Sequence, residues 1–341
     1  MKWHYEDYIK WIIQGCSIDL NVSELDISNQ NITSLEGINN LSNLTSLNCS
    51  YNRITSLKGI NNLNNLTSLN CSYNQIMSLE DITNLINLKS LHCNNNKNIS
   101  LQGIDNLINV QILSCYSNNL KSLKGLNKLI NLQELYCPGN QLTSLSPINN
   151  LIYLQKLNCS YNKLISLEEI YDLKFLQELD CSENRLISLK GINNLSLLSI
   201  LKCTNNQITS LEDITNLINL QEFCCNFNKI NSLKGINNLN ALQSFHCFCN
   251  EITSLDFITH LTNLTELSCG CNKIESLSPI NNLINLKKFY CGFNKIISLE
   301  GINNLRSLQI LHCFHNQIRS LLPTNNLDNL IDFQYYSNPI E

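Results

Sequence analysis

Cysteine and histidine are the residues of this chain that could bind a metal or act in catalysis. The 341 residues include 17 cysteines and 6 histidines. Thirteen of the cysteines recur at a constant spacing of 22 residues, and we call them the ladder cysteines. They are Cys49, Cys71, Cys93, Cys115, Cys137, Cys159, Cys181, Cys203, Cys225, Cys247, Cys269, Cys291 and Cys313. Since a thiolate can ligate a metal or attack an electrophile, the spacing has to decide what these residues do.

Three cysteines outside the ladder and one histidine could form a metal site. Cys224 and His246 lie 22 residues apart, and so do Cys249 and Cys271. If these two rows converged, three thiolates and one imidazole would suit Zn²⁺. Four ligands on a nearly flat surface rarely surround an ion as a tetrahedron, and the spacing matches no zinc motif. We therefore predict scattered thiols and no metal site.

Motifs for catalysis are absent from the sequence. It has no glycine-rich phosphate loop, no H-E-x-x-H motif and no nucleophile elbow. His312 and His315 are the two histidines closest in sequence, and no known pattern places a carboxylate or a nucleophile beside them. We predict that the protein is not an enzyme and uses no cofactor.

The ladder cysteines belong to a sequence repeat of 22 residues, which must determine where the remaining residues lie. The unit from Leu47 to Ser68 shows its pattern, L-x-C-x-x-N-x-I-x-S-L-x-x-I-x-N-L-x-N-L-x-x. In L-x-C, residues two apart share one face of a short strand, so Leu47 and Cys49 point inward and Asn48 points outward. Because a thiol packs as a small apolar group, we predict that the ladder cysteines line a core.

An asparagine follows each ladder position by three residues, where the chain must turn out of the strand. Its short amide can satisfy backbone groups of its own repeat and of the adjacent one, so we predict a structural role. These residues are Asn52, Asn74, Asn96, Asn118, Asn140, Asn162, Asn184, Asn206, Asn228, Asn250, Asn272, Asn294, Asn316 and Asn338.

The units resemble leucine-rich repeats, and their constant length of 22 residues is similar to that of the internalins and of the phosphatase-regulatory leucine-rich repeat protein. The resemblance covers about Leu20 to Ile340. It implies an α/β repeat fold, a right-handed solenoid with a parallel β-sheet on its concave side and 3₁₀ or irregular segments on its convex side. We predict about 15 units of 22 residues over 21–341. Because the family shares a scaffold and no single chemistry, the resemblance does not identify a function.

The first 20 residues precede the repeats. Helical spacing is shown by the apolar residues Tyr5, Tyr8, Ile9 and Ile12. This spacing predicts an amphipathic helix over Lys2 to Gln14. A solenoid exposes its core at each end, so we expect residues 1–20 to form a helical cap. The same apolar face could instead bind a groove on a partner.

The outward strand positions become aromatic in the C-terminal third of the chain. In the first units they are mostly serine and asparagine, and in the middle they become charged. Exposed aromatic side chains are costly in water and dominate binding hot spots. We therefore predict a partner-binding surface on the concave face, formed by Phe227, His246, Phe248, Tyr290, Phe293, His312, Phe314 and His315.

The favoured function is a non-catalytic module that binds an unknown protein partner. The net charge of −4 provides no cationic surplus for nucleic acid or an anionic membrane. No apolar stretch is long enough to span a membrane and no export signal is visible, which favours the cytoplasm. The excess of asparagine and isoleucine resembles proteins of AT-rich genomes, including giant viruses, and a viral protein would lie in the host cytoplasm. Two alternatives remain, a structural protein that self-associates through an open C-terminal end and a surface-displayed adhesin like the internalins.

Overall fold

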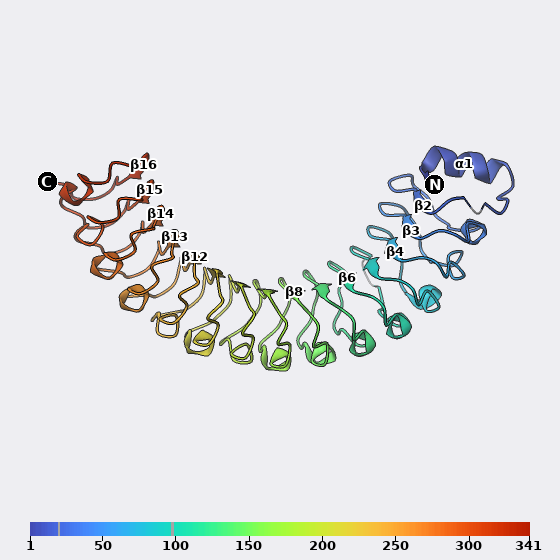
Figure 1. The fold of residues 1–341 in the computed structure, drawn as a ribbon, viewed down its shortest axis with the longest axis horizontal. Coiled ribbons are helices and arrows are strands. Elements are labelled where there is room, and N and C mark those ends of the chain that lie inside the picture. The colour runs from blue at the N-terminus through green and yellow to red at the C-terminus, as the bar shows by residue number, and fades with distance from the viewer. Residues whose placement is uncertain (20, 97–98) are drawn as a thin grey trace. The chain divides into compact units, whose positions relative to one another are not determined.

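Two compact units of repeats make up the protein, Met1–Lys163 (unit 1) and Leu164–Glu341 (unit 2). The computed structural model describes residues 1–19, 21–96 and 99–341. Each repeat contributes one short strand, which pairs in parallel with the strands of neighbouring repeats in its unit. In Figure 1 the strands of each unit lie on the inner side of that unit's curve, and the 3₁₀ turns lie on its outer side.

The strands follow the L-x-C pattern. In unit 1 they are β1 (Lys2–Trp3), β2 (Glu24–Asp26), β3 (Ser46–Asn48), β4 (Ser68–Asn70), β5 (Ser90–His92), β6 (Ile112–Ser114), β7 (Glu134–Tyr136) and β8 (Lys156–Asn158). In unit 2 they are β9 (Glu178–Asp180), β10 (Ile200–Lys202), β11 (Glu222–Cys224), β12 (Ser244–His246), β13 (Glu266–Ser268), β14 (Lys288–Tyr290), β15 (Ile310–His312) and β16 (Asp332–Gln334). Neighbouring strands pair at an offset of 22 residues, as Leu47 with Leu69 does, so equal positions of the repeat form rows.

Short 3₁₀ helices lie on the side of many repeats opposite the strands. They are η1 (Ile38–Asn40), η2 (Glu80–Ile82), η3 (Ile104–Asn106), η4 (Leu126–Lys128), η5 (Ser146–Ile148), η6 (Glu168–Ile170), η7 (Glu212–Ile214), η8 (Asp256–Ile258), η9 (Ser278–Ile280) and η10 (Leu322–Thr324). In a repeat that turns without one, Gly235 has a φ of 111°, and a Cβ atom there would overlap the Leu211 carbonyl of the preceding repeat. The prediction of a parallel-strand solenoid with 3₁₀ turns is confirmed.

The N-terminal segment contains a strand that its sequence pattern does not reveal. Lys2 and Trp3 form β1, which pairs with β2, and the helix α1 (Tyr5–Ile13) begins three residues later than expected. A hydrogen bond from the His4 backbone N–H to the Asp7 carboxylate, 3.1 Å long, caps the start of α1. In the described part of the chain, no helix is long and apolar enough to cross a membrane.

The ladder cysteines lie in the core with the leucines and isoleucines of the repeat, and all thirteen are 0% exposed. Burial raises the pKa of the Cys71 and Cys115 thiols to about 12, because the interior disfavours a thiolate. The predicted packing role of the ladder cysteines is confirmed.

The predicted role of the ladder asparagine is also confirmed. The Asn118 amide, 1% exposed, donates from Nδ2 to the carbonyls of Cys93 at 3.0 Å and Cys115 at 2.9 Å. Its Oδ1 accepts the backbone N–H of Asn96 at 2.7 Å. One side chain thus joins two consecutive repeats and satisfies backbone groups that would otherwise be buried without partners.

A second asparagine, the last in N-L-x-N-L, also connects repeats, although its sequence position indicated no role. Nδ2 of Asn109 donates to the Ile86 carbonyl of the preceding repeat at 2.8 Å. In unit 2, Nδ2 of Asn219 donates in the same way to the Ser196 carbonyl at 2.8 Å. Each of these repeats is therefore tied to the preceding one on both sides of the coil.

Candidate functional site

The outward side chains of the strands, with those of the turns that follow, form what we call the strand face. Each repeat presents on it the residue before its ladder cysteine and the two residues after it. Because neighbouring repeats pair in register, these residues stand in rows along a unit. All eight predicted site residues lie in these rows in unit 2.

Phe227 and Phe248 form one aromatic pair on the strand face. Their ring centroids lie 5.6 Å apart, and the rings meet edge to face. Phe227 is 51% exposed, whereas Phe248 is partly buried. The Asn226 Oδ1 accepts the backbone N–H of Phe248 at 2.8 Å and so fixes the turn that carries this ring.

The other aromatic side chains gather in a second group, which we call the C-terminal aromatic cluster. It consists of Tyr290, Phe293, His312, Phe314, His315 and Tyr336. Phe314 stacks on Tyr336 with centroids 4.8 Å apart and 4° between the ring planes. Phe293 stacks on His315 at 4.5 Å and meets Phe314 edge to face at 5.4 Å. Tyr290 meets His312 edge to face at 5.2 Å.

Two glycines leave room for these rings. Gly270 and Gly292 occupy the same row as Phe248 and Phe314. A Cβ atom on Gly270 would lie 3.0 Å from Cδ2 of Phe248, and one on Gly292 would lie 2.9 Å from Cε2 of Phe314. Each ring therefore lies against the glycine of the adjacent repeat, and the two rings lean toward each other from either side of the glycine pair.

The backbone disfavours the aromatic residues that lie two positions after a ladder cysteine. Phe227, Phe293 and His315 have φ angles of 52°, 57° and 51°. This left-handed region costs a residue with a Cβ atom roughly 1–2 kcal/mol, and glycine and asparagine tolerate it best. Other repeats place Gly139 and Asn205 in this row. An aromatic side chain there is thus explained by packing or binding and not by backbone preference.

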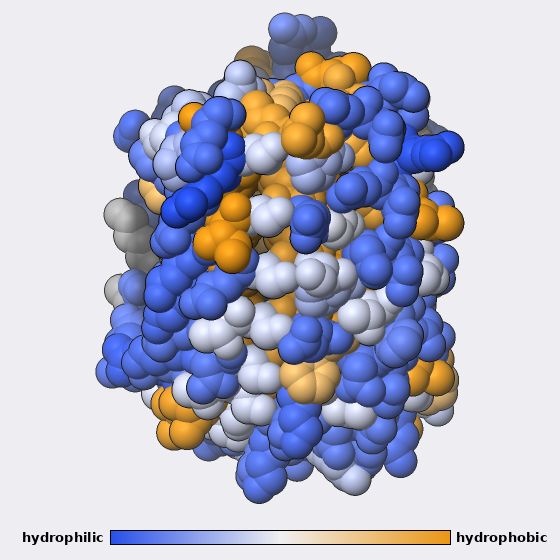
Figure 2. All heavy atoms as spheres, turned by 90° about the vertical axis from the view of Figure 1, so that its left-hand side faces the viewer, coloured by the Kyte–Doolittle hydropathy of each residue, from blue (hydrophilic) through white to orange (hydrophobic). Residues whose placement is uncertain are grey.

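The C-terminal end of unit 2 exposes apolar side chains. Figure 2 views this end and shows hydrophobic residues along its middle with hydrophilic residues on both sides. Leu322, Ile331 and Tyr335 are 73%, 81% and 41% exposed. Exposed apolar surface of this kind favours contact with another molecule.

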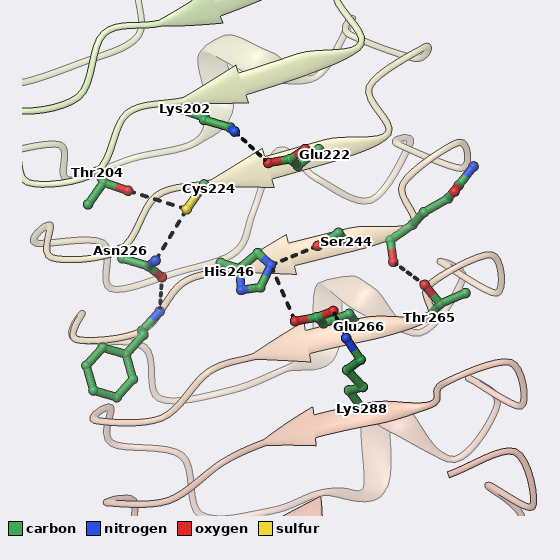
Figure 3. A network of polar contacts seen from close by, with 12 residues as sticks. Lys202, Thr204, Glu222, Cys224, Asn226, Ser244, His246, Thr265, Glu266 and Lys288 are labelled. Atoms are coloured by element: carbon green, nitrogen blue, oxygen red, sulfur yellow. Dashed lines mark hydrogen bonds and ion pairs between the residues drawn. The ribbon is translucent and has the colours of Figure 1, made fainter. Parts of the chain in front are cut away.

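His246 belongs to a polar network and not to the aromatic groups (Figure 3). Its Nε2 lies 2.8 Å from the Ser244 hydroxyl and 3.8 Å from the Glu266 carboxylate. Glu266 also pairs with Lys288 at 3.1 Å. The His246 ring thus turns along the strands toward these polar partners.

Several charged residues on the strand face of unit 2 form ion pairs with one another. Lys202 and Glu222 form an ion pair (Figure 3), in which Lys202 Nζ lies 3.1 Å from the carboxylate. His312 Nε2 lies 2.7 Å from the Asp332 carboxylate while its ring contacts Tyr290. The charges around the aromatic side chains are therefore largely matched locally.

The residues of the metal hypothesis remain in two separate pairs. Cys224 stands beside His246 across β11 and β12, and its Sγ contacts Thr204 at 3.4 Å. Cys249 and Cys271 stand beside each other in a different row. Within residues 1–19, 21–96 and 99–341, no three His, Cys, Asp or Glu side chains are placed to hold a metal ion together.

Several members of these groups escaped the sequence prediction. Gly270 and Gly292 were not predicted, although they determine where two of the rings lie. In unit 1, Tyr51 stacks on Tyr73 at 4.2 Å in rows that had looked uninformative. Their row positions were visible in the sequence, but the contacts depend on side-chain directions that spacing does not specify.

Known proteins share these repeats. The family model "Leucine Rich repeats (2 copies)" matches residues 130–174 and 240–282. A leucine-rich-repeat protein of Leptospira interrogans is 28% identical over 100% of this chain and 95% of its own, with a TM-score of 0.92. An internalin of Listeria monocytogenes, InlF, is 26% identical over 90% of this chain and 85% of its own, with a TM-score of 0.75.

A further structural match extends to the cysteines. The functional domain of InlJ from Listeria monocytogenes, which includes a cysteine ladder, is 28% identical over 89% of this chain and 71% of its own, with a TM-score of 0.73. A search of curated protein sequences found no match. Taken with the strand order and the 3₁₀ turns, these matches show that the chain is a leucine-rich-repeat protein that resembles the internalins.

Proposed function

We propose that the protein is a non-catalytic module that binds a protein partner through the strand face of unit 2. The leucine-rich-repeat fold is a general scaffold for protein interaction. The observation that carries the proposal is the placement of Phe227 and Phe293, which are 51% and 50% exposed in a backbone conformation that disfavours them. Aromatic side chains that stay accessible at such a cost are candidates for binding hot spots.

The partner should present an apolar contact surface and not a strongly charged one. Rings supply the contact area of the strand face, while ion pairs such as Lys288 with Glu266 match the charges beside them. Exposed paired charges contribute little to binding and are screened by salt. We therefore expect partner capture to depend only weakly on ionic strength.

A double variant tests this assignment. Phe248→Ala with Phe293→Ala removes one ring from each aromatic group, and we expect the partner isolated with the parent protein to bind at least about tenfold more weakly. The matched control is Ile130→Ala with Ile152→Ala, which removes apolar side chains that are 52% and 45% exposed in unit 1. Equal affinity of both double variants, with folding verified by circular dichroism, would overturn the assignment.

Self-association is a second candidate function, favoured by the exposed apolar residues at the C-terminal end of unit 2. Ile331 is 81% exposed there, next to β16. We expect Ile331→Asp to abolish any rise of the solution mass with concentration, because an aspartate cannot be buried in an apolar contact. A parent protein that stays monomeric at high concentration would exclude this function.

We also propose a reducing compartment, the cytoplasm, as the place where the protein acts. The thirteen buried ladder thiols support this location, because oxidising compartments favour disulfides. Cell fractionation tests it, and recovery of the protein at the cell surface would favour the adhesin alternative.

A further inference from the structure

We propose that Cys249 and Cys271 form a redox site, at which the two thiols close to a disulfide by exchange with a small disulfide such as oxidised glutathione. The inference concerns the thiols themselves and does not depend on the proposed partner. It starts from their positions, since each lies two residues after a ladder cysteine in consecutive repeats.

The backbone brings these two residues into the geometry that a disulfide needs. Their φ angles are 52° and 54°, so their Cα–Cβ bonds leave the coil in the same direction. The N–H of Cys249 donates to the Gly270 carbonyl at 3.0 Å, which holds the two turns side by side. Adjacent parallel segments lie about 4.8 Å apart, within the Cα separation of about 4.4–6.8 Å that a disulfide accepts.

The two thiols are neighbours in one row of the strand face. Burial and the neighbouring Cys271 thiol raise the pKa of Cys249 to about 12. Because the two thiols hold equivalent positions, either one can begin the exchange and the other completes it.

Solvent exposure distinguishes Cys249 and Cys271 from neighbouring ladder cysteines. Ladder cysteines also stand in equal positions of consecutive repeats, but they are 0% exposed, so a dissolved disulfide cannot reach them. Cys249 and Cys271 are partly exposed on the strand face. Cys224 is partly exposed too, but its neighbours in the paired strands are Lys202 and His246.

The exchange balances in two steps. One of the two thiols, for example that of Cys271, gives up its proton, and its thiolate attacks oxidised glutathione, forming a mixed disulfide and releasing one glutathione. The Cys249 thiol then loses its proton and attacks Sγ of Cys271, which releases the second glutathione. The protein loses two hydrogen atoms as two protons and two electrons, and the small disulfide is reduced to two thiols.

The position of the pair gives the disulfide a structural consequence. Phe227 and Phe293 occupy the same row on either side of the two cysteines. A disulfide would hold the two intervening turns together and fix the spacing between the aromatic groups.

The test uses the reduced full-length chain, incubated with oxidised glutathione under native conditions and then alkylated. We expect peptide mapping to join Cys249 to Cys271, with the loss of two hydrogen atoms and no glutathione retained at either residue. Cys249→Ser and Cys271→Ser should instead each retain one glutathione, because the resolving thiol is missing. Cys224→Ser is the matched control and should still form the cross-link.

Three results would overturn the redox site. They are glutathione retained at either cysteine of the parent chain, a disulfide with a different partner, and two unmodified thiols under conditions that fully oxidise a dithiol peptide.

Discussion

The ring of Phe314 lies against the backbone of Gly292 in the preceding repeat, so closely that a Cβ atom on Gly292 would lie 2.9 Å from Cε2 of the ring. The opposite side of the same ring stacks on Tyr336. The position of Phe314 thus depends both on the absence of a side chain at Gly292 and on stacking against Tyr336.

Gly292→Ala should displace the Phe314 ring. The φ angle of Gly292 lies outside the left-handed region, so the added methyl group acts through its volume alone. We expect a loss of about 1–3 kcal/mol in the free energy of unfolding, the usual cost of overpacking. NMR should show the ring protons of Tyr336 shifting as the stacked ring moves away.

Thr262→Ala, in the exposed turn between η8 and β13, provides the control and should leave the Tyr336 resonances unchanged. Identical Tyr336 shifts in Gly292→Ala and the parent protein would show that the glycine does not position the ring.

Asparagine substitutions separate backbone strain from binding. Tyr161 has a φ of 52° and is 62% exposed, so Tyr161→Asn should raise the free energy of unfolding by about 1 kcal/mol. Phe227→Asn relieves the same strain but loses the contact with Phe248, worth about 0.5–1.5 kcal/mol, so its stability should hardly change. Chemical denaturation measures both effects.

Partner binding should distinguish the two variants. Phe227→Asn should bind the partner more weakly, and Tyr161→Asn, in unit 1, should bind it as the parent does. If Phe227→Asn binds normally, the strained aromatic row has no role in recognition.

The asparagine ladder should show a gradient of stability effects. Asn118→Ala leaves the buried carbonyls of Cys93 and Cys115 without a donor, so we expect a loss of about 3 kcal/mol or more. Asn338 also donates to a backbone carbonyl, that of Cys313 at 3.0 Å, but it is partly exposed and water can replace it. Asn338→Ala should therefore cost about 1 kcal/mol. Equal losses in thermal unfolding would contradict the burial argument.

The fold could be predicted because one constraint repeats in every unit. Leu47 and Cys49 had to share a face, and any shift of register would have exposed the whole row, so periodicity alone placed the core. Lys2 and Trp3 form a strand with no such signal, because two residues show no alternation and the pairing depends on β2.

The site could be predicted only as rows of residues. The spacing placed Phe293 and His315 side by side, and the structure stacks them. It could not show that His246 turns toward Glu266, because that depends on the side-chain rotamer. Nor could it show that the second residue after a ladder cysteine has a left-handed backbone conformation, because that position contains residues as different as Tyr161 and Cys249.

The buried thiols predict a loss of stability in alkali. Burial raises the pKa of Cys71, Cys115 and Cys269 to about 12, whereas a thiol in the unfolded chain ionises near about 8.5. Because the folded-state pKa is raised, the stabilisation is complete below the unfolded value and is lost as the pH rises through the folded value. Each buried thiol should cost up to about 1.4 kcal/mol per pH unit between these limits.

Urea unfolding measured from about pH 7 to about pH 10 checks this sign and slope. We expect the free energy of unfolding to fall ever more steeply above about pH 8.5, because all thirteen ladder cysteines are buried. Cys115→Ala removes one titrating thiol, so its free energy of unfolding should fall less steeply with pH, by up to about 1.4 kcal/mol per pH unit. Stability that does not change across this range would mean that the ladder thiols ionise inside the folded protein, which their burial among apolar side chains should prevent.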